Sequence, residues 1–202
     1  GIKDLQLAFL RTNSKQNLLN DPLRILRCIR FVSELDFNVD VNLINFIKTY
    51  KNQLSLVASE RINYEIQRII RGKKASQAII LINKFKIFDY IQLQKNLIFL
   101  DLEKINFEEF NKFEKEKFLP LFYLVQILDE FSLKNLKFSK SEISKIRLLR
   151  KWNLLLKIKT IYEFSERERF DLHQELETIL PSFIRFLPET YYKDWLARWR
   201  DK

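Results

Sequence analysis

The chain has 202 residues, and 47% of them are hydrophobic, which is enough for a packed core and excludes an intrinsically disordered segment. With 2 Gly, 4 Pro, 1 Cys and 1 His, the composition excludes a turn-rich β fold, a disulfide framework, and a metal site or catalytic triad built on histidines. The formal net charge is +10, and residues 1–100 carry most of it, with 16 Lys and Arg against 8 Asp and Glu, so a polyanionic partner is favoured over a merely basic surface.

The composition favours long helices, and the expected fold class is all-α. One short strand is permitted near the N-terminus by the alternation of Leu5 and Leu7, and residues 12–20 are expected to form a polar loop. Neither a signal peptide nor an apolar run of about 18 residues occurs, so we expect a cytoplasmic protein without a membrane partner. Met is absent, so the chain lacks an initiator residue and is expected to be a fragment of a longer protein.

The stretch that begins at Asp21 predicts a helix that runs to about Leu35. Asp21 is expected to be the N-cap residue, and Pro22 falls at the first helical position, where its missing N–H costs nothing. The helical period predicts a core-facing stripe in which Cys28 acts as a small buried hydrophobe. The residues of this stripe are Ile25, Cys28, Ile29, Val32 and Leu35.

Two arginines of the same helix, Arg24 and Arg27, share a neighbouring strip with Phe31. A carboxylate and two guanidinium groups near the first turns of one helix form a set of donors and acceptors that could read a nucleobase edge or hold a phosphate. The alternative is an ordinary amphipathic helix with a capping Asp and solvated arginines. The residues alone leave both interpretations open.

Further helices are predicted along the chain. Asp40 is a candidate N-cap for a helix over 41–50, and Ser59 is one for a helix over about 60–71, which Gly72 is expected to stop. Within the latter helix, Arg61 and Glu65 lie one turn apart and are expected to pair. The remaining helical patterns cover about 75–88, 108–131, 139–159, 166–179 and 189–200, with Ser139 or Ser141 and then Ser165 as candidate caps, and with Pro120 as a kink or break.

Two groups of basic residues are candidates for contacts with RNA phosphates. The first group lies at the end of the Ser59 helix and directly after it, and consists of Arg68, Arg71, Lys73 and Lys74. The second lies within residues 145–159, which hold six basic residues and no acid; its candidates are Arg147, Arg150 and Lys151. A basic helix of this kind can also bind an anionic membrane or a partner protein, or be a solvated face over a core stripe.

Three blocks in a fixed order carry a resemblance to a known family. The central block is Asp-Pro-Leu-Arg-Ile-Leu-Arg-Cys-Ile-Arg-Phe at residues 21–31. Upstream lies Gly-Ile-Lys-Asp-Leu at residues 1–5 with Arg11, and downstream lies Ser-Glu-Arg-Ile at residues 59–62 with Glu65. These blocks resemble the class II tRNA nucleotidyltransferase and poly(A) polymerase family, which includes the CCA-adding enzymes. The resemblance is good over residues 1 to about 90, and the rest is similar mainly in being helical and basic.

The resemblance implies an elongated arrangement of helical neck and body domains. Residues 1–20 correspond to the end of the catalytic head and its hinge, residues 21–90 to a nucleotide-recognising neck, and residues 91–202 to a helical body and tail that bind tRNA. The implied partners are therefore tRNA and nucleoside triphosphates, while the oligomeric state is not indicated by the sequence.

The same resemblance implies roles for individual residues. Asp21 and Arg24 are expected to read the incoming base by hydrogen bonds to its Watson–Crick edge, and Arg27 to help hold the nucleotide. Glu60 and Arg61 are expected to support this site. One departure is Asn20, since the family usually has an acid directly before the Asp, and this is expected to loosen the positioning of Arg24.

The complete enzyme is expected to add C and A from CTP and ATP to tRNA 3′ ends, with Mg²⁺ held by paired carboxylates of a Gly-rich head domain. No such Asp-x-Asp motif occurs in this chain, so no metal site is expected here and the fragment alone is expected to be inactive. Alternatives within the family are CC-adding, A-adding or poly(A) polymerase activity. Alternatives outside it are a non-catalytic helical RNA-binding module and a protein-interaction scaffold.

Overall fold

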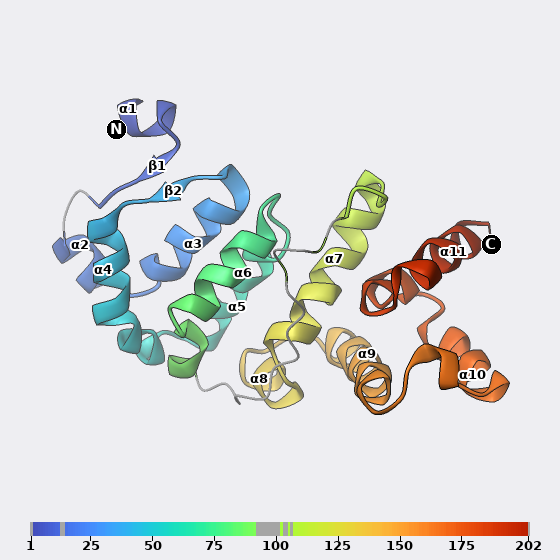
Figure 1. Cartoon of the computed structure of the whole chain (residues 1–202). Coiled ribbons are helices and arrows are strands. Elements are labelled where there is room, and N and C mark those ends of the chain that lie inside the picture. The colour runs from blue at the N-terminus through green and yellow to red at the C-terminus, as the bar shows by residue number, and fades with distance from the viewer. Residues whose placement is uncertain (1, 13–14, 92–101, 103–104, 106, 202) are drawn as a thin grey trace. The chain divides into compact units, whose positions relative to one another are not determined.

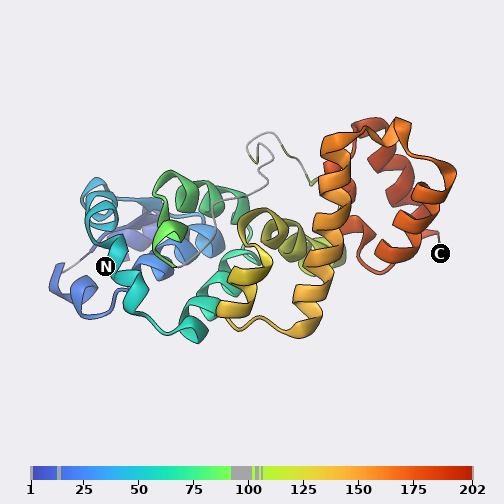
Figure 2. The same ribbon diagram turned by 90° about the horizontal axis from the view of Figure 1, so that it is seen from below.

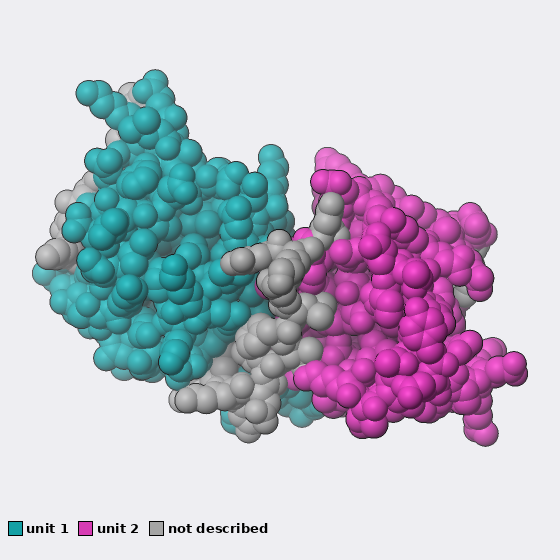
Figure 3. Space-filling view, in the orientation of Figure 1, with its two compact units in different colours: residues 1–97, 127–138 teal, residues 98–126, 139–202 magenta. Residues whose placement is uncertain are grey.

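The computed structural model describes residues 2–12, 15–91, 102, 105 and 107–201. Nearly all of its regular structure is helical, and the predicted all-α fold class is confirmed. The chain forms two compact units, of which unit 1 comprises residues 1–97 and 127–138 and unit 2 comprises residues 98–126 and 139–202 (Figure 3). Residues 127–138 thus belong to unit 1, although the division drawn from the sequence places them in the body.

Unit 1 contains the elements that carry the motif residues. In chain order they are α1 (Ile2–Gln6), β1 (Phe9–Leu10), α2 (Lys15–Asn20), α3 (Arg24–Leu35), β2 (Asn38–Val39), α4 (Val41–Tyr50), a 3₁₀ helix (Lys51–Leu56), α5 (Ser59–Ile69), α6 (Ala75–Lys84), a 3₁₀ helix (Ile87–Tyr90) and α8 (Glu130–Asn135) (Figure 1). Helix α3 packs against both α5 and α6 (Figures 1 and 2). Ile25, Leu26 and Ile29 of α3 are between 0% and 1% exposed, so this helix forms the centre of the unit's core.

Two short parallel strands, β1 and β2, form instead of the strand predicted from Leu5 and Leu7. The pairs in this register are Phe9 with Asn38 and Leu10 with Val39. Leu5 and Leu7 are 63% and 66% exposed, so their alternation does not mark a half-buried strand. The predicted polar loop is also wrong in part, because α2 occupies Lys15–Asn20 directly before the motif.

Helix α3 begins at Arg24, and the prediction that Asp21 is its N-cap is wrong. The backbone N–H of Arg24 donates to the carbonyl oxygen of Asp21 at 3.0 Å, so a turn through Pro22 leads into the helix. Leu23 holds the N-cap position and offers no side-chain acceptor. The Asp21 carboxylate is therefore available for a distant partner. At the other end, Leu35 is 50% exposed and does not belong to the core stripe.

A close approach between α3 and the turn after α5 accounts for Gly72. A Cβ atom at this position would lie 2.1 Å from Ser33 Oγ and 2.6 Å from the Ser33 carbonyl oxygen, so the turn requires Gly. The buried Ser33 Oγ donates to the carbonyl oxygen of Ile69 at 2.5 Å, and the N–H of Lys74 donates to the Ser33 carbonyl at 2.8 Å. Gly72 is thus selected by packing, while α5 already ends at Ile69 with Ile70 as its C-cap.

The remaining main helices lie in unit 2, except that the last residue of α7 belongs to unit 1. They are α7 (Lys112–Ile127), α9 (Lys140–Ile158), α10 (Glu166–Leu176) and α11 (Glu189–Arg200), with 3₁₀ helices at Ile161–Glu163, Leu180–Ser182 and Ile184–Phe186. Helix α9 packs against α10 (Figure 2). Pro120 lies inside α7 and does not divide it; the helical stretch predicted to reach residue 131 divides after Ile127 instead.

Local capping signals are mostly confirmed. Ser139 Oγ accepts from the N–H of Glu142 at 3.2 Å, and Ser165 Oγ accepts from the N–H of Glu168 at 3.3 Å, each within a capping box. Asp40 caps α4 as predicted. Ser59 does not cap α5, because it is the first residue of that helix and Ala58 holds the N-cap position.

A buried carboxylate connects α7 with α11 inside unit 2. The Glu114 side chain is 1% exposed and accepts from Arg200 Nη2 at 2.6 Å and from Arg200 Nε at 2.7 Å. It also accepts from the backbone N–H of Asn111 at 2.9 Å, at the start of α7. The hydrogen bonds from Arg200 lower the pKa of Glu114, and so the last residue of α11 holds the first turn of α7.

We expect Arg200→Ala to lower the free energy of unfolding of unit 2 by about 2 kcal/mol at neutral pH, because the buried Glu114 carboxylate loses its charged donor. Folding lowers the pKa of Glu114, so the ionised carboxylate stabilises unit 2 at any pH above the pKa that Glu114 has in the unfolded chain. This stabilisation is lost as the pH falls through the pKa that Glu114 has in the folded protein. The difference between variant and parent chain should therefore shrink in acid.

The measurement is urea unfolding followed by tryptophan fluorescence, since all 3 tryptophans of the chain lie in unit 2. Arg198→Ala is the matched control on α11, because Arg198 pairs at 2.9 Å with Asp194, which is 55% exposed. This control should change the free energy of unfolding by less than about 0.5 kcal/mol. Equal losses in the two variants would contradict the assignment.

Candidate functional site

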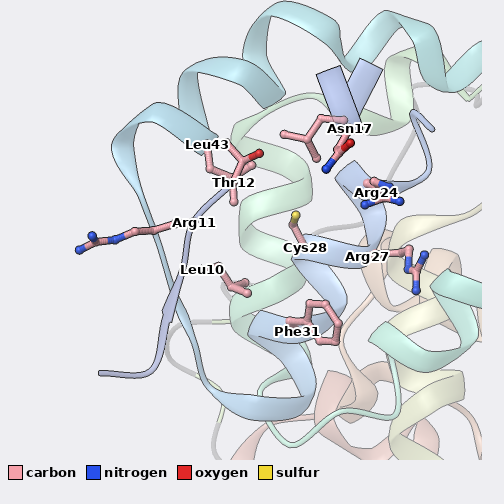
Figure 4. A pocket seen from close by; sticks show the side chains of 10 residues that line it. Leu10, Arg11, Thr12, Asn17, Arg24, Arg27, Cys28, Phe31 and Leu43 are labelled. Atoms are coloured by element: carbon pink, nitrogen blue, oxygen red, sulfur yellow. The ribbon is translucent and has the colours of Figure 1, made fainter. Parts of the chain in front are cut away.

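A pocket of about 360 Å³ opens in unit 1 among β1, α2, α3 and α4 (Figure 4). This volume falls in the range of small-molecule sites, about 300–1,000 Å³. Its apolar lining comes from Leu10, Leu18, Phe31 and Leu43, and its main polar lining comes from Asn17, Arg24 and Arg27. The strip predicted from the sequence for α3 is therefore brought together, because Arg24, Arg27 and Phe31 all line this pocket.

Three arginines line this pocket, and two of them, Arg24 and Arg27, have no polar partner among the described residues. Arg24 and Arg27 are exposed, and neither side chain makes a hydrogen bond or an ion pair within the described residues. The other arginines in the described part of unit 1 are engaged by polar groups: Arg11 by Asp4, Arg30 by Glu34 and Glu65, Arg61 by Asp21, Arg68 by Glu34, and Arg71 by Gln67. Arg24 and Arg27 thus keep their donors for a ligand.

Asp21 lies outside the lining of this pocket and is held by α5. Arg61 Nη2 lies 3.2 Å from Asp21 Oδ1 and 3.3 Å from Oδ2, across forty positions of sequence. The Asp21 side chain is 24% exposed and the Arg61 side chain is 54% exposed, so solvent reaches the pair. The prediction that Arg61 pairs with Glu65 is wrong, because the Arg61 guanidinium pairs with the Asp21 carboxylate instead.

Cys28 lines the pocket between the arginines and the apolar residues (Figure 4). It is half-buried, and the prediction of a fully buried small hydrophobe is therefore only partly right. Burial raises the pKa of the Cys28 thiol to about 11, although the guanidinium groups of Arg27 and Arg24 oppose this rise. The thiol is therefore neutral at physiological pH and adds an uncharged surface to the pocket.

A buried ion pair joins α3, the helix that carries Arg24 and Arg27, to α5. Arg30 Nη1 lies 3.3 Å from Glu65 Oε2, and the two side chains are 7% and 4% exposed. Arg30 Nε lies 3.5 Å from Glu34, which also accepts from Arg68 Nε at 2.8 Å. Burial raises the pKa of Glu65, and the charge of Arg30 is the largest effect that opposes it. This network fixes the orientation of the helix that carries Arg24 and Arg27.

This network was not predicted from the sequence. Arg30 was absent from the predicted core stripe, although it lies one turn after Leu26 and three residues before the buried Ser33. A polar residue flanked at helical spacing by core residues is a signal of a buried polar group that needs a partner. The partner itself, Glu65, could only be identified once α5 was placed against α3.

The first basic group lies at the C-terminal end of α5 and just after it. Arg68 is paired with Glu34, Lys74 Nζ lies 3.2 Å from Asp36 Oδ2, and Arg71 Nη1 donates to the carbonyl of Gln67 at 2.9 Å. Lys73 is exposed. Glu60, one of the two predicted supporting residues, is also exposed in the first turn of α5. Of these supporting residues, the structure brings Arg61 into contact with the motif.

The second basic group lies on α9, in unit 2. Lys151 Nζ lies 2.6 Å from Glu175 Oε1 on α10, and Arg150 Nη2 donates to the carbonyl oxygen of Val125 at 3.0 Å. Arg147 is exposed. Of this group, Lys151 and Arg150 therefore contact other parts of unit 2, and the Arg147 side chain is open to solvent.

The described residues contain neither a metal-binding cluster nor a membrane-spanning helix. No group of three or more His, Cys, Asp or Glu side chains within the described part of the chain could hold a metal ion. Within the same residues, none of the helices combines the length and apolar character needed to span a bilayer.

Two unpaired guanidinium groups that line a pocket of this size provide donors for a ligand with acceptor groups, such as a phosphate. The comparisons with known proteins agree. A family model described as the probable RNA and SrmB-binding site of polymerase A matches residues 36–96. The CCA-adding enzyme of Ligilactobacillus salivarius is 30% identical over 155 residues, covering 75% of this chain and 35% of that protein.

Two further relatives extend the comparison. The CC-adding tRNA nucleotidyltransferase of Shouchella clausii is 35% identical over 79 residues, covering 39% of this chain and 21% of its own length. The structure of the Thermotoga maritima CCA-adding enzyme complexed with tRNA shares the fold, with a TM-score of 0.67 and 20% identity over 99% of this chain and 53% of that one. The chain belongs to the class II tRNA nucleotidyltransferase family, and it spans about a third of the first curated relative.

Proposed function

We propose that the protein containing this chain adds C and A from CTP and ATP to the 3′ ends of tRNA, and that this chain supplies base recognition and tRNA binding. The names of its relatives support the reaction, and the family model supports contact with RNA. One observation carries the base-recognition part: Arg24 and Arg27 are the arginines without a polar partner in the described part of unit 1, and both line the same pocket.

The chemistry of base selection follows from donors and acceptors. Cytosine and adenine each carry an exocyclic amine beside a ring nitrogen that accepts, whereas uracil and guanine carry a carbonyl beside a ring N–H. Arg24 donates to the ring nitrogen or carbonyl, and the Asp21 carboxylate accepts from the amine. Arg61 uses only part of the acceptor capacity of this carboxylate, which has about four lone-pair positions. Arg27, one turn further on, holds the nucleotide.

Asn20 stands where the family usually has an acid, and it accepts a hydrogen bond from Gln16 Nε2 at 2.9 Å. Because Asn20 carries no charge, we expect it to position Arg24 less firmly than an acid would. Glu60 and Arg61 act as supporting residues, of which Arg61 orients Asp21.

Binding of tRNA is assigned to the two basic groups. Lys73, Arg71, Arg68 and Lys74 lie within the region matched by the RNA-binding family model, and Arg147, Arg150 and Lys151 lie on α9. Contacts between such residues and phosphates release counterions, so tRNA affinity depends steeply on salt.

A CC-adding activity is the second candidate, and it is favoured by the similarity to the Shouchella clausii enzyme. A pocket that reads C and A by the same groups fits both activities. Location in the cytoplasm remains a prediction.

Magnesium is required by the proposed reaction as the ion that activates the RNA hydroxyl and neutralises the triphosphate. The described residues do not fit such a site, because they contain no cluster of three potential ligands. We therefore assign the metal to another part of the protein and derive no step through it here.

The test is the incorporation of labelled CTP and ATP into a tRNA that lacks its 3′ CCA. We expect the complete protein to add two C and one A, and this chain alone to add nothing. Addition of C alone would favour the CC-adding alternative. No addition by the complete protein would contradict the proposal, and turnover by the chain alone would show that it contains a catalytic centre.

A further inference from the structure

Asn17 of α2 faces the same pocket as Arg24. It lines the pocket, its side chain is exposed, and it makes no hydrogen bond within the described residues (Figure 4). Among the unpaired side chains of the described lining, it is the one that carries an acceptor oxygen. Asp21, by contrast, does not line the pocket, and both of its carboxylate oxygens face Arg61.

The two unpaired groups are complementary in hydrogen bonding. A guanidinium group has five N–H donors and no acceptor, whereas a carboxamide has one acceptor oxygen and two N–H donors. Together they match an edge that presents an amine next to a ring acceptor, which is the edge shared by cytosine and adenine. Apolar residues such as Leu43 and Leu18, which are 1% and 6% exposed, form the apolar wall of the same pocket.

We propose that Asn17 is a further specificity-determining residue, whose carboxamide oxygen accepts from one N–H of the exocyclic amine of the incoming cytosine or adenine, while the other N–H is left for the Asp21 carboxylate and Arg24 donates to the ring. This inference rests on the proposed function and deepens it. An amide can turn and offer its N–H groups instead of its oxygen, whereas a carboxylate cannot. Asn17 therefore accepts C and A but rejects uracil and guanine less sharply than an acid in its place.

The experiment measures kcat/KM of the complete protein for CTP, ATP and UTP on a tRNA without its 3′ end. Asn17→Leu, which keeps the size and removes the hydrogen bonds, should lower the preference for CTP over UTP by about tenfold. Asn17→Asp should keep CTP use within about threefold of the parent protein and raise the preference for CTP over UTP. Gln16→Leu is the matched control on α2, since Gln16 is absent from the pocket lining and bonds to Asn20.

The possible outcomes separate this inference from the proposed function. An unchanged CTP to UTP preference in both Asn17 variants, in a protein that adds C and A and whose Arg24→Ala variant is impaired, overturns the role of Asn17 alone. An equal loss of preference in Gln16→Leu also overturns it, because the effect would then come from the conformation of α2. Failure of the parent protein to add C or A overturns the proposed function instead.

Discussion

Arg24→Ala in the complete protein should lower kcat/KM for CTP and ATP by about 10- to 100-fold, because a guanidinium contact with a base edge contributes about 1–3 kcal/mol of discrimination. The affinity for tRNA should stay within about twofold, since Arg24 is one of many positive charges and lines a pocket. Arg24→Lys should not restore base choice, because an ammonium group lacks the planar, forked donors of a guanidinium.

The measurement compares incorporation of CTP, ATP, UTP and GTP with tRNA binding at several salt concentrations. Arg71→Ala is the matched control, because Arg71 is exposed, donates to the carbonyl oxygen of Gln67 in α5 and lies outside the pocket lining. It should weaken tRNA binding slightly without changing base choice. Normal discrimination in Arg24→Ala would refute the role of Arg24 in base recognition.

Arg30→Met should lower the free energy of unfolding of unit 1 by about 3–5 kcal/mol at neutral pH, since it leaves the buried Glu65 carboxylate without its counter-charge. Burial already raises the pKa of Glu65, so ionisation of this group opposes folding. A group of this kind favours the folded state below its unfolded pKa, and this contribution is lost as the pH rises through the folded pKa. The destabilisation by Arg30→Met should therefore be larger at about pH 8 than at about pH 5.

Amide hydrogen exchange of α3 and α5 is the appropriate measurement, because the tryptophans report only on unit 2. The double variant Arg30→Met with Glu65→Met is the control, since it removes both charges and fills the space with apolar atoms. It should recover most of the lost stability. If the double variant is as unstable as the single one, packing rather than charge explains the effect.

The sequence predicted those features that depend on local spacing. Helical period alone placed Arg24, Arg27 and Phe31 on one strip, and the pocket confirms that they share a surface. The caps Ser139 and Ser165 were also predictable, because a capping box spans four consecutive residues.

The remaining features depend on pairs that are distant along the chain. The contact of Asp21 with Arg61 and that of Arg30 with Glu65 each join α3 or the turn before it to α5. Local spacing predicted that Asp21 caps α3 and that Glu65 pairs within its own helix. In the structure, contacts between α3 or its preceding turn and α5 take the place of both interactions. Asn17 was missed because its segment is polar and was predicted as a loop, although α2 orders it beside the pocket.

Because residues 127–138 belong to unit 1, the order of synthesis determines when this unit can complete its folding. During translation, helices α3 to α6 emerge before α8, and Asn63 Nδ2 then still lacks the Leu136 carbonyl to which it donates at 2.7 Å. Unit 1 is therefore complete only after all of α7 has left the ribosome, so its last folding step must wait for a segment that is synthesised after α7.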